Sequence, residues 1–384
     1  MRWRQMAELI AEFERVFRKR PEALASAPGI VNVIGEDSGH DTGLVLAVAL
    51  EQRVRVAVAR RPDRRVYLRS RGIGGESALA LDKLERTWGW TDPVAAVLEM
   101  LEREGLRQGG FEMYVEGELP VGAGLASSAA LELALVSALD ALAGSRLSAP
   151  DRAQLCWQAE NAFMGVGEAL TPFLAAVATQ PDHFVLVDCH DRSTRVLALE
   201  PTDYHLVLID TGLRKTASQA DAQRVRDECR QAFEAAQAAR GDLERLRDLT
   251  EGELEAVDER ARKRCRHIIG EAERVRNATD ALDGGELGQL GRLLNESHAS
   301  LASHLEIEPQ ELDGLTRLVQ SAPGVLGARL ARERNAGCVV ALVHDAALEP
   351  LEQRTRKFYD QRYGRDSRLL TVGRPGAAIT VELT

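Results

Sequence analysis

Cysteine is sparse in this sequence and lacks the spacing of a metal or disulfide site. The 384-residue chain has five cysteines, scattered along its length, with no CxxC pair and no Cys/His cluster. An odd number without regular spacing argues against a disulfide framework of the kind found in secreted domains. We therefore expect reduced thiols and a cytoplasmic protein.

Long apolar runs and basic blocks are also missing. No run of about 18 apolar residues occurs, which excludes a transmembrane helix. The N-terminal residues MRWRQMAELIAEFERVF are amphipathic and lack the apolar core of a signal peptide. The net charge is −10, and no basic block is large enough to cover a face of the protein. We therefore expect neither a nucleic-acid nor a membrane partner.

Apolar periodicity predicts a mixture of helices and strands in the first half. Residues 4–19 have helical spacing, and the Ala-Pro-Gly at 27–29 should break that structure before a short strand at 31–34. Two further runs rich in β-branched residues, 44–50 and 54–59, predict separate strands. The pattern is typical of an α+β protein.

The second half has a different character, which suggests two domains. Residues 216–302 are charge-rich and almost wholly helical in pattern, and a strand-helix-strand pattern follows to the end. The change occurs near residues 190–205. We therefore divide the chain into domains at 1–200 and 201–384.

The segment 120–132, which reads PVGAGLASSAALE, carries the clearest chemical signal. Gly122 and Gly124 allow a backbone to approach a ligand without interference from Cβ atoms. Free N–H groups at the start of the following helix suit phosphate oxygens. Ser127 or Ser128 could cap that helix or give a hydroxyl to a phosphate-bound metal. The alternative is a tight turn that caps a buried helix.

Four segments in the same order and spacing resemble the galactokinase branch of the GHMP small-molecule kinases. APGIVNVIGE at 27–36 resembles the galactokinase signature, and 120–132 looks like the phosphate-binding motif of that family. QAENAFMG at 158–165 is similar to the helix before the family's catalytic carboxylate. ESHASL at 296–301 resembles a stretch in its C-terminal half.

This resemblance implies a fold, a reaction and a set of site residues. The implied fold is the two-domain GHMP kinase fold, with an N-terminal mixed-sheet domain, a C-terminal ferredoxin-like domain and the ligands between them. The implied reaction is transfer of the γ-phosphoryl group of ATP, with Mg²⁺, to C1 of galactose. The implied contacts are with nucleotide, metal and sugar: Gly122, Gly124, Leu125, Ser127 and Ser128 for the nucleotide, Ser128 and Glu160 for Mg²⁺, and Glu36 and Asp37 for the sugar.

Several positions depart from the family pattern. The family's catalytic Asp falls at Pro172 when we count from the segment 158–165, and the Arg of the first motif falls at Ile30. Neither residue can act as a base or carry charge. After Glu36 the family has His and, two residues further on, Asp, where this chain has Asp37 and Gly39. A sugar-contacting Tyr lines up, by a loose count, with Ala222.

The third, glycine-rich family motif is also altered. Residues 332–337 read RERNAG, so that Arg332, Glu333 and Arg334 replace glycines. Long side chains would be strained where a glycine loop needs positive φ. Either the segment takes another shape, or Arg332 or Arg334 binds phosphate directly. For His298, which the family shares, we expect a structural hydrogen bond.

Three functions are compatible with this pattern. The first is a galactokinase-like protein that is impaired or non-catalytic and binds nucleotide or a protein partner. The second is an active kinase for a sugar or another small molecule, in which Asp37, Asp41 or Glu168 replaces the missing base. The third is a binding module for an unrelated small molecule. Loss of the base, its Arg partner and the sugar contacts together favours the first.

Overall fold

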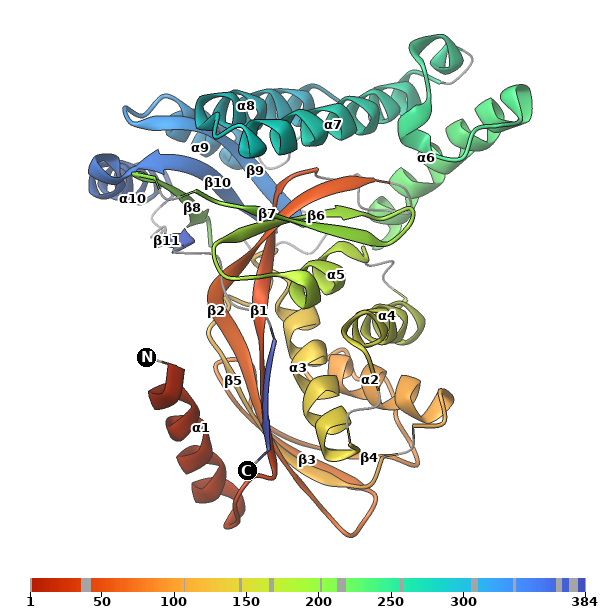
Figure 1. Cartoon of the computed structure of the whole chain (residues 1–384), viewed down its shortest axis with the longest axis vertical. Coiled ribbons are helices and arrows are strands. Elements are labelled where there is room, and N and C mark those ends of the chain that lie inside the picture. The colour runs from red at the N-terminus through yellow and green to blue at the C-terminus, as the bar shows by residue number, and fades with distance from the viewer. Residues whose placement is uncertain are drawn as a thin grey trace.

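An eight-stranded, mostly antiparallel sheet forms the lower part of the molecule (Figure 1). The computed structural model describes the chain except for residues 1, 36–42, 107, 145–146, 166–168, 201, 213–218, 256–257, 305–309, 334–335, 364–367, 373–378 and 384. The main path of this sheet has the order β12-β1-β2-β5-β3-β4, and β6 and β7 extend it from β2. Its strands are β1 (Ala23–Ile34), β2 (Leu44–Arg60), β3 (Arg65–Arg71), β4 (Glu76–Ala80), β5 (Phe111–Gly117), β6 (His183–Asp188), β7 (Ser193–Ala198) and β12 (Thr380–Leu383).

Two predictions about these strands were wrong. Residues 44–50 and 54–59 belong to one strand, β2, because the less buried residues Glu51, Gln52 and Arg53 only interrupt the apolar pattern. The Ala-Pro-Gly at 27–29 lies inside strand β1 and does not interrupt the secondary structure. Pro28 is accommodated there because the pairing of β1 with β2 shifts register directly after it.

Helices cover both faces of the first sheet. Helix α1 (Arg2–Phe17) packs on β2 and β5 at one face. On the other face α3 (Ser127–Leu142) lies along β1 and β2, with α2 (Asp92–Arg103), α4 (Ala149–Ala159) and α5 (Thr171–Ala178) around it (Figure 1). Helix α3 is buried along most of its length, since Ala and Leu occupy 10 of its 16 positions.

The second sheet shares its core with the first. Its order is β11-β8-β10-β9, with β8 (Tyr204–Asp210), β9 (Val325–Glu333), β10 (Ala336–His344) and β11 (Arg368–Val372). Alternate residues of a strand point to opposite faces. Leu206 and Leu208 therefore join the large core of the first sheet, whereas Val207 and Ile209 join a smaller core beneath α9 and α10. Apolar packing thus links the two sheets directly.

The helices of the second half are α6 (Gln219–Arg240), α7 (Glu259–Asp283), α8 (Leu287–His304), α9 (Gln310–Gln320) and α10 (Leu348–Tyr363), with the 3-10 turns η2 (Leu246–Asp248), η3 (Glu251–Leu254) and η4 (Asp345–Ala347). Of these helices, α7, α8 and α9 lie above this sheet in Figure 1, α10 lies beside it and α6 lies at the far right. Helix α7 packs along α8 and also reaches β1, β2 and β7 of the first sheet. Among the described residues, no helix is long and apolar enough to cross a bilayer.

The α+β fold expected from the sequence is confirmed, and the last strand adds a feature that the sequence did not indicate. Strand β12 returns from the second half and pairs antiparallel with the start of β1. The division at 1–200 and 201–384 stays a proposal, to which β12 would be an exception.

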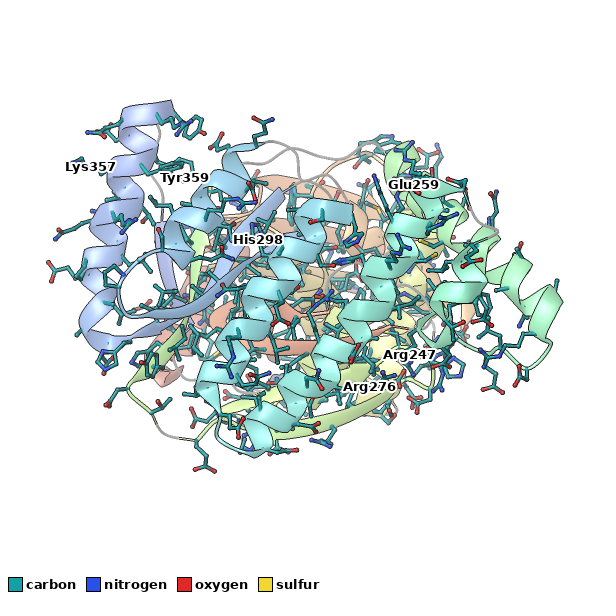
Figure 2. The ribbon with its side chains drawn as sticks, turned by 90° about the horizontal axis from the view of Figure 1, so that it is seen from above. Arg247, Glu259, Arg276, His298, Lys357 and Tyr359 are labelled. Atoms are coloured by element: carbon teal, nitrogen blue, oxygen red, sulfur yellow. The ribbon has the colours of Figure 1, made fainter. Side chains whose placement is uncertain are left out.

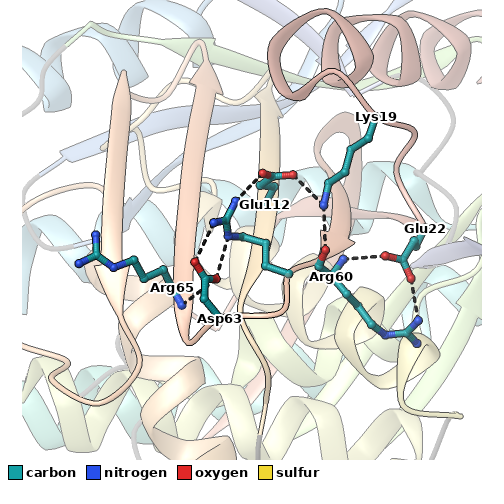
Figure 3. Close-up of polar contacts among 7 residues, drawn as sticks. Lys19, Glu22, Arg60, Asp63, Arg65 and Glu112 are labelled. Carbon is teal, nitrogen blue, oxygen red and sulfur yellow. Dashed lines mark hydrogen bonds and ion pairs between the residues drawn. The ribbon is translucent and has the colours of Figure 1, made fainter.

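Charged side chains fasten the end of α1 to the first sheet (Figure 3). Glu112 on β5 accepts from Lys19 at 2.8 Å and from Arg61 at 2.7 Å, and Lys19 also donates to the carbonyl of Arg60 at 2.7 Å. Glu22 pairs with Arg60 at 2.6 Å. The Arg60–Glu22 pair is exposed and contributes about 0–1 kcal/mol, whereas Glu112 is mostly buried beneath its two partners. This cluster is remote from the motifs, and we assign it a structural role.

Candidate active site

The first two motifs lie side by side. The N–H of Ile30 on β1 donates to the carbonyl of Leu125 in the loop before α3, at 3.2 Å. A Cβ atom at Gly29 would lie 2.4 Å from the side chain of Leu119, so the close approach of the two segments depends on that glycine. Segments separated by about 90 residues therefore form one surface at the start of α3.

The loop before α3 has the geometry of an anion site. Gly122 and Gly124 have φ values of 71° and 74°, and Ala126 has φ 53°. The N-cap residue is Ala126, and no side chain caps the helix. The expectation that Ser127 or Ser128 caps α3 was therefore wrong, because the helix begins at Ser127 itself. Uncapped N–H groups and the positive end of a 16-residue helix suit phosphate oxygens.

Ser128 and Glu160 lie together, as a shared metal site would require. Ser128 Oγ donates to Glu160 Oε1 at 2.7 Å, and Glu160 is 6% exposed, at the start of a π-helix, η1 (Glu160–Met164). Among the described residues, no group of three or more His, Cys, Asp or Glu side chains could hold a metal. One carboxylate and one hydroxyl nevertheless fit Mg²⁺, which takes few protein ligands and completes its shell with phosphate and water.

Glu132, one turn further along α3, is a second carboxyl beneath this pair. Its Oε1 lies 3.3 Å from Ser128 Oγ, and its Oε2 is buried with no hydrogen-bond partner among the described residues. Burial and then the nearby charge of Glu160 raise the pKa of Glu132 well above its usual value, against a smaller effect from Ser128. A neutral Glu132 would leave Glu160 as the anion at the start of α3.

Replacing Glu132 with Gln should stabilise the protein, and more so at higher pH. The raised pKa means that the contribution of this carboxyl is fully present below about pH 4.5 and is lost as the pH rises towards the folded-state pKa. Gln does not titrate, so it avoids that loss, which amounts to about 1.4 kcal/mol for each pKa unit. Urea unfolding at pH 6 and pH 8 measures the difference. An equal gain at both pH values, or no gain, would contradict the expected ionisation.

The segment that replaces the family's third motif is a β-hairpin rather than a glycine-rich loop. Strand β9 continues to Glu333, β10 begins at Ala336, and Arg332 pairs with Gly337. Extended strands need no positive φ, so charged residues are tolerated. Cys338, early in β10, contacts the carbonyl of Ala123 at 3.5 Å. The hairpin and the glycine loop are therefore on the same side of the molecule. Phosphate binding by Arg332 or Arg334 stays a prediction, because neither side chain is among those described.

The two positions at which we expect the family's catalytic Arg and Asp, Ile30 and Pro172, are on elements that pack together. Ile30 is 3% exposed and belongs to the large apolar core on β1. Pro172 is half-buried in the first turn of α5, where proline costs no helical hydrogen bond. Helix α5 packs on β1 and β2. We predict that Ile30 and Pro172 are in direct contact.

Some predicted site residues are outside the part of the chain that the structure describes. They are the sugar-contact candidates Glu36 and Asp37, the altered slot Gly39, and the acids Asp41 and Glu168. Ala222 lies on α6, but its side chain is also outside the described set. His298 Nε2 on α8 donates a hydrogen bond to Asp313 Oδ1 at 3.1 Å, which confirms the expected structural bond.

Sequence reasoning missed a buried charged cluster where α7, α8 and β9 meet the end of β1. Glu271 and Arg329 are both fully buried, and Arg329 Nη1 lies 3.3 Å from the carbonyl of Val33. Ser297 donates to Glu271 Oε1 at 2.6 Å. Within a charge-rich helical stretch, nothing in the spacing marks Glu271 as different from its exposed neighbours.

Comparison with known proteins agrees with this geometry. Residues 92–177 match the model of the GHMP kinase N-terminal domain, and residues 11–60 match the galactokinase galactose-binding signature. Galactokinase from Roseiflexus sp. is 32% identical over 363 residues, with 93% of each chain covered. Human galactokinase is 31% identical over 376 residues, with 94% of each covered. The crystal structure of Lactococcus lactis galactokinase complexed with galactose has a TM-score of 0.90 at 28% identity and covers 98% of this chain and 99% of that one. The chain therefore belongs to the galactokinase family of the GHMP kinases.

Proposed function

We propose that this protein keeps the nucleotide and metal half of a galactokinase site and has lost much of the phosphoryl-transfer chemistry. It would bind MgATP, and galactose or a related small molecule, in the cytoplasm, and it would phosphorylate C1 of galactose slowly or not at all. The observation that carries this proposal is Ile30, which occupies the slot of the family's Arg. The Ile30 side chain is in the apolar core, and its N–H is committed to Leu125.

The proposed nucleotide and metal contacts lie at the start of α3. The N–H groups there would bind ATP phosphates, and Ser128 and Glu160 would hold Mg²⁺. Bound Mg²⁺ would neutralise charge on the phosphates. Charge developing on the transferred group would then lack the cation that the family places at Ile30, and the acceptor hydroxyl would lack the carboxylate that it places at Pro172. All five cysteines are buried and none is joined in a disulfide, which supports the proposed cytoplasmic location.

Removing the proposed metal ligands should weaken nucleotide binding only when Mg²⁺ is present. Ser128→Ala and Glu160→Gln are each expected to lower affinity for MgATP by about 10- to 100-fold. Affinity for ATP in excess EDTA should not change, since the N–H groups of the loop remain. Isothermal titration calorimetry with and without Mg²⁺ measures both quantities.

Ser137→Ala is the matched control for these variants. Ser137 is on the same helix, is fully buried, and its hydroxyl has no hydrogen-bond partner among the described residues. It should bind MgATP like the unmodified protein. A loss of affinity in EDTA equal to the loss in Mg²⁺ would refute the metal assignment and leave only a role in loop structure.

A further inference from the structure

Helix α7 lies across the point where the connection between β1 and β2 begins and ends. Gly35 follows β1 and Gly43 precedes β2. The residues between them include Glu36, the sugar-contact candidate, which is next to Gly35 in the sequence. Helix α7 packs against both strands. The second half of the chain thus contacts the two strands that this connection joins.

At the Gly35 end, a buried carboxylate holds the backbone. Glu271 Oε1 on α7 accepts from the N–H of Gly35 at 3.0 Å. Gly35 has φ +105°, and a Cβ atom there would lie 2.5 Å from the carbonyl oxygen of Leu44. The backbone therefore fits closely between Glu271 and the start of β2. A hydrogen bond from N–H to a charged acceptor is stronger than a neutral one and fixes direction as well as distance.

Glu271 acts as an anion because several donors surround it. Burial opposes ionisation, but His267, Arg329 and Arg274, with a hydrogen bond from Ser297, lower the pKa of Glu271 to about 2. Arg329 Nη1 also lies 3.4 Å from the carbonyl of Asn32 and 3.3 Å from that of Val33. An anion and a cation from the second half therefore hold the last residues of β1 by its N–H and carbonyl groups.

At the Gly43 end, a second buried ion pair acts through β6. Arg247, in the turn η2 beside α7, donates from both Nη atoms to Asp188, at 3.0 and 2.6 Å (Figure 2). The Arg247 side chain is only 2% exposed. Asp188 is the residue of β6 that pairs with Leu44, and the next N–H, that of Cys189, donates to the carbonyl of Gly43 at 3.0 Å. Arg247 thus fixes the strand end that holds Gly43.

We propose that Glu271 and Arg247 are positioning residues for the sugar site, which fix the two ends of the connection between β1 and β2. This inference rests on the proposed function, since it assumes that the connection contacts the sugar. Both residues come from the stretch α6 to α7. This helical part of the second half therefore influences the affinity for galactose. Neither residue is assigned to the nucleotide or the metal.

The test compares Glu271→Gln and Arg247→Met with Arg195→Gln. The control breaks the ion pair of Arg195 with Asp283 at 2.6 Å, which also joins the first sheet to α7 but has side chains that are 54% and 58% exposed. Amide hydrogen exchange is followed in peptides that span residues 31–46, and affinities for galactose and ATP are measured by calorimetry. We expect about tenfold faster exchange in these peptides and about tenfold weaker galactose binding in the first two variants, with ATP affinity unchanged. The control should match the unmodified protein in every measurement.

Each outcome either supports or contradicts the positioning role of Glu271 and Arg247. If exchange rises equally throughout the chain, or rises in 31–46 without any change in galactose affinity, the two residues are merely structural and the inference is wrong. If the unmodified protein binds no galactose, the proposed sugar ligand fails, and local exchange alone then tests whether these residues fix the connection. Should Glu271→Gln not fold, Arg247→Met and the milder Arg247→Lys carry the test at the Gly43 end, with exchange expected to rise less for Lys.

Discussion

Galactose and MgATP are expected to react about 10²- to 10⁴-fold more slowly on this protein than on human galactokinase assayed beside it. The carboxylate slot holds Pro172, which cannot accept a proton, and the cation slot holds Ile30, which is 3% exposed in the apolar core. Catalytic groups act as a unit, so their losses do not sum, and the range for a lost base is the appropriate scale. A coupled assay of ADP release measures the rate.

The variant Pro172→Asp plus Ile30→Arg separates missing chemistry from missing substrate binding. Ile30→Arg alone should be poorly stable, since it buries a charge without a partner. If the two new side chains meet, the double variant should be more stable than that single variant and should gain turnover. Normal turnover by the unmodified protein would contradict the proposal and direct attention to Asp37, Asp41 and Glu168 as a replacement base.

Arg329→Met should destabilise the protein by about 3–5 kcal/mol, the usual cost of removing one of two buried opposite charges, because the charge of Arg329 favours the Glu271 anion. Methionine fills most of the space, so the loss comes mainly from the Glu271 anion, which keeps fewer positive neighbours, and from the carbonyls of Asn32 and Val33. Because the pKa of Glu271 is lowered from 4.5 to about 2, its contribution to stability is present above about pH 4.5 and lost as the pH falls towards 2.

Urea unfolding of Arg329→Met at neutral pH measures this cost. Arg195→Gln serves again as the control and should change the free energy of unfolding by about 0–1 kcal/mol, since its ion pair is exposed. The difference between Arg329→Met and the unmodified protein should shrink in acid, as Glu271 takes up its proton. A loss of less than about 1 kcal/mol in the free energy of unfolding at neutral pH would show that Glu271 is already neutral, or that other cations compensate its charge.

Short-range pattern was sufficient to predict much of the fold. Helix α2, Asp92–Arg103, follows from local pattern, because its apolar residues repeat on one face and Asp-Pro begins it. The glycine loop and α3 were predicted from a local motif whose φ values require glycine at 122 and 124. The errors in β1 and β2 arose where pairing with a neighbouring strand decides whether a strand continues. Pro28 is tolerated by a register shift, and residues 51–53 continue a strand that pairs on both sides.

The sequence by itself determined the family, and it predicted a phosphate loop and the loss of charge at the two positions assigned to catalytic residues, because each depends on residue identity at a local spacing. Only the tertiary structure decided which distant groups meet. It brought Ser128 to Glu160 across 32 positions and Glu271 to Gly35 across 236, and it turned the segment around Arg332 into a hairpin by pairing it with Gly337. The physical reason is that burial and pairing of a charge depend on the elements packed around it, and helical periodicity cannot distinguish a buried carboxylate from a solvated one.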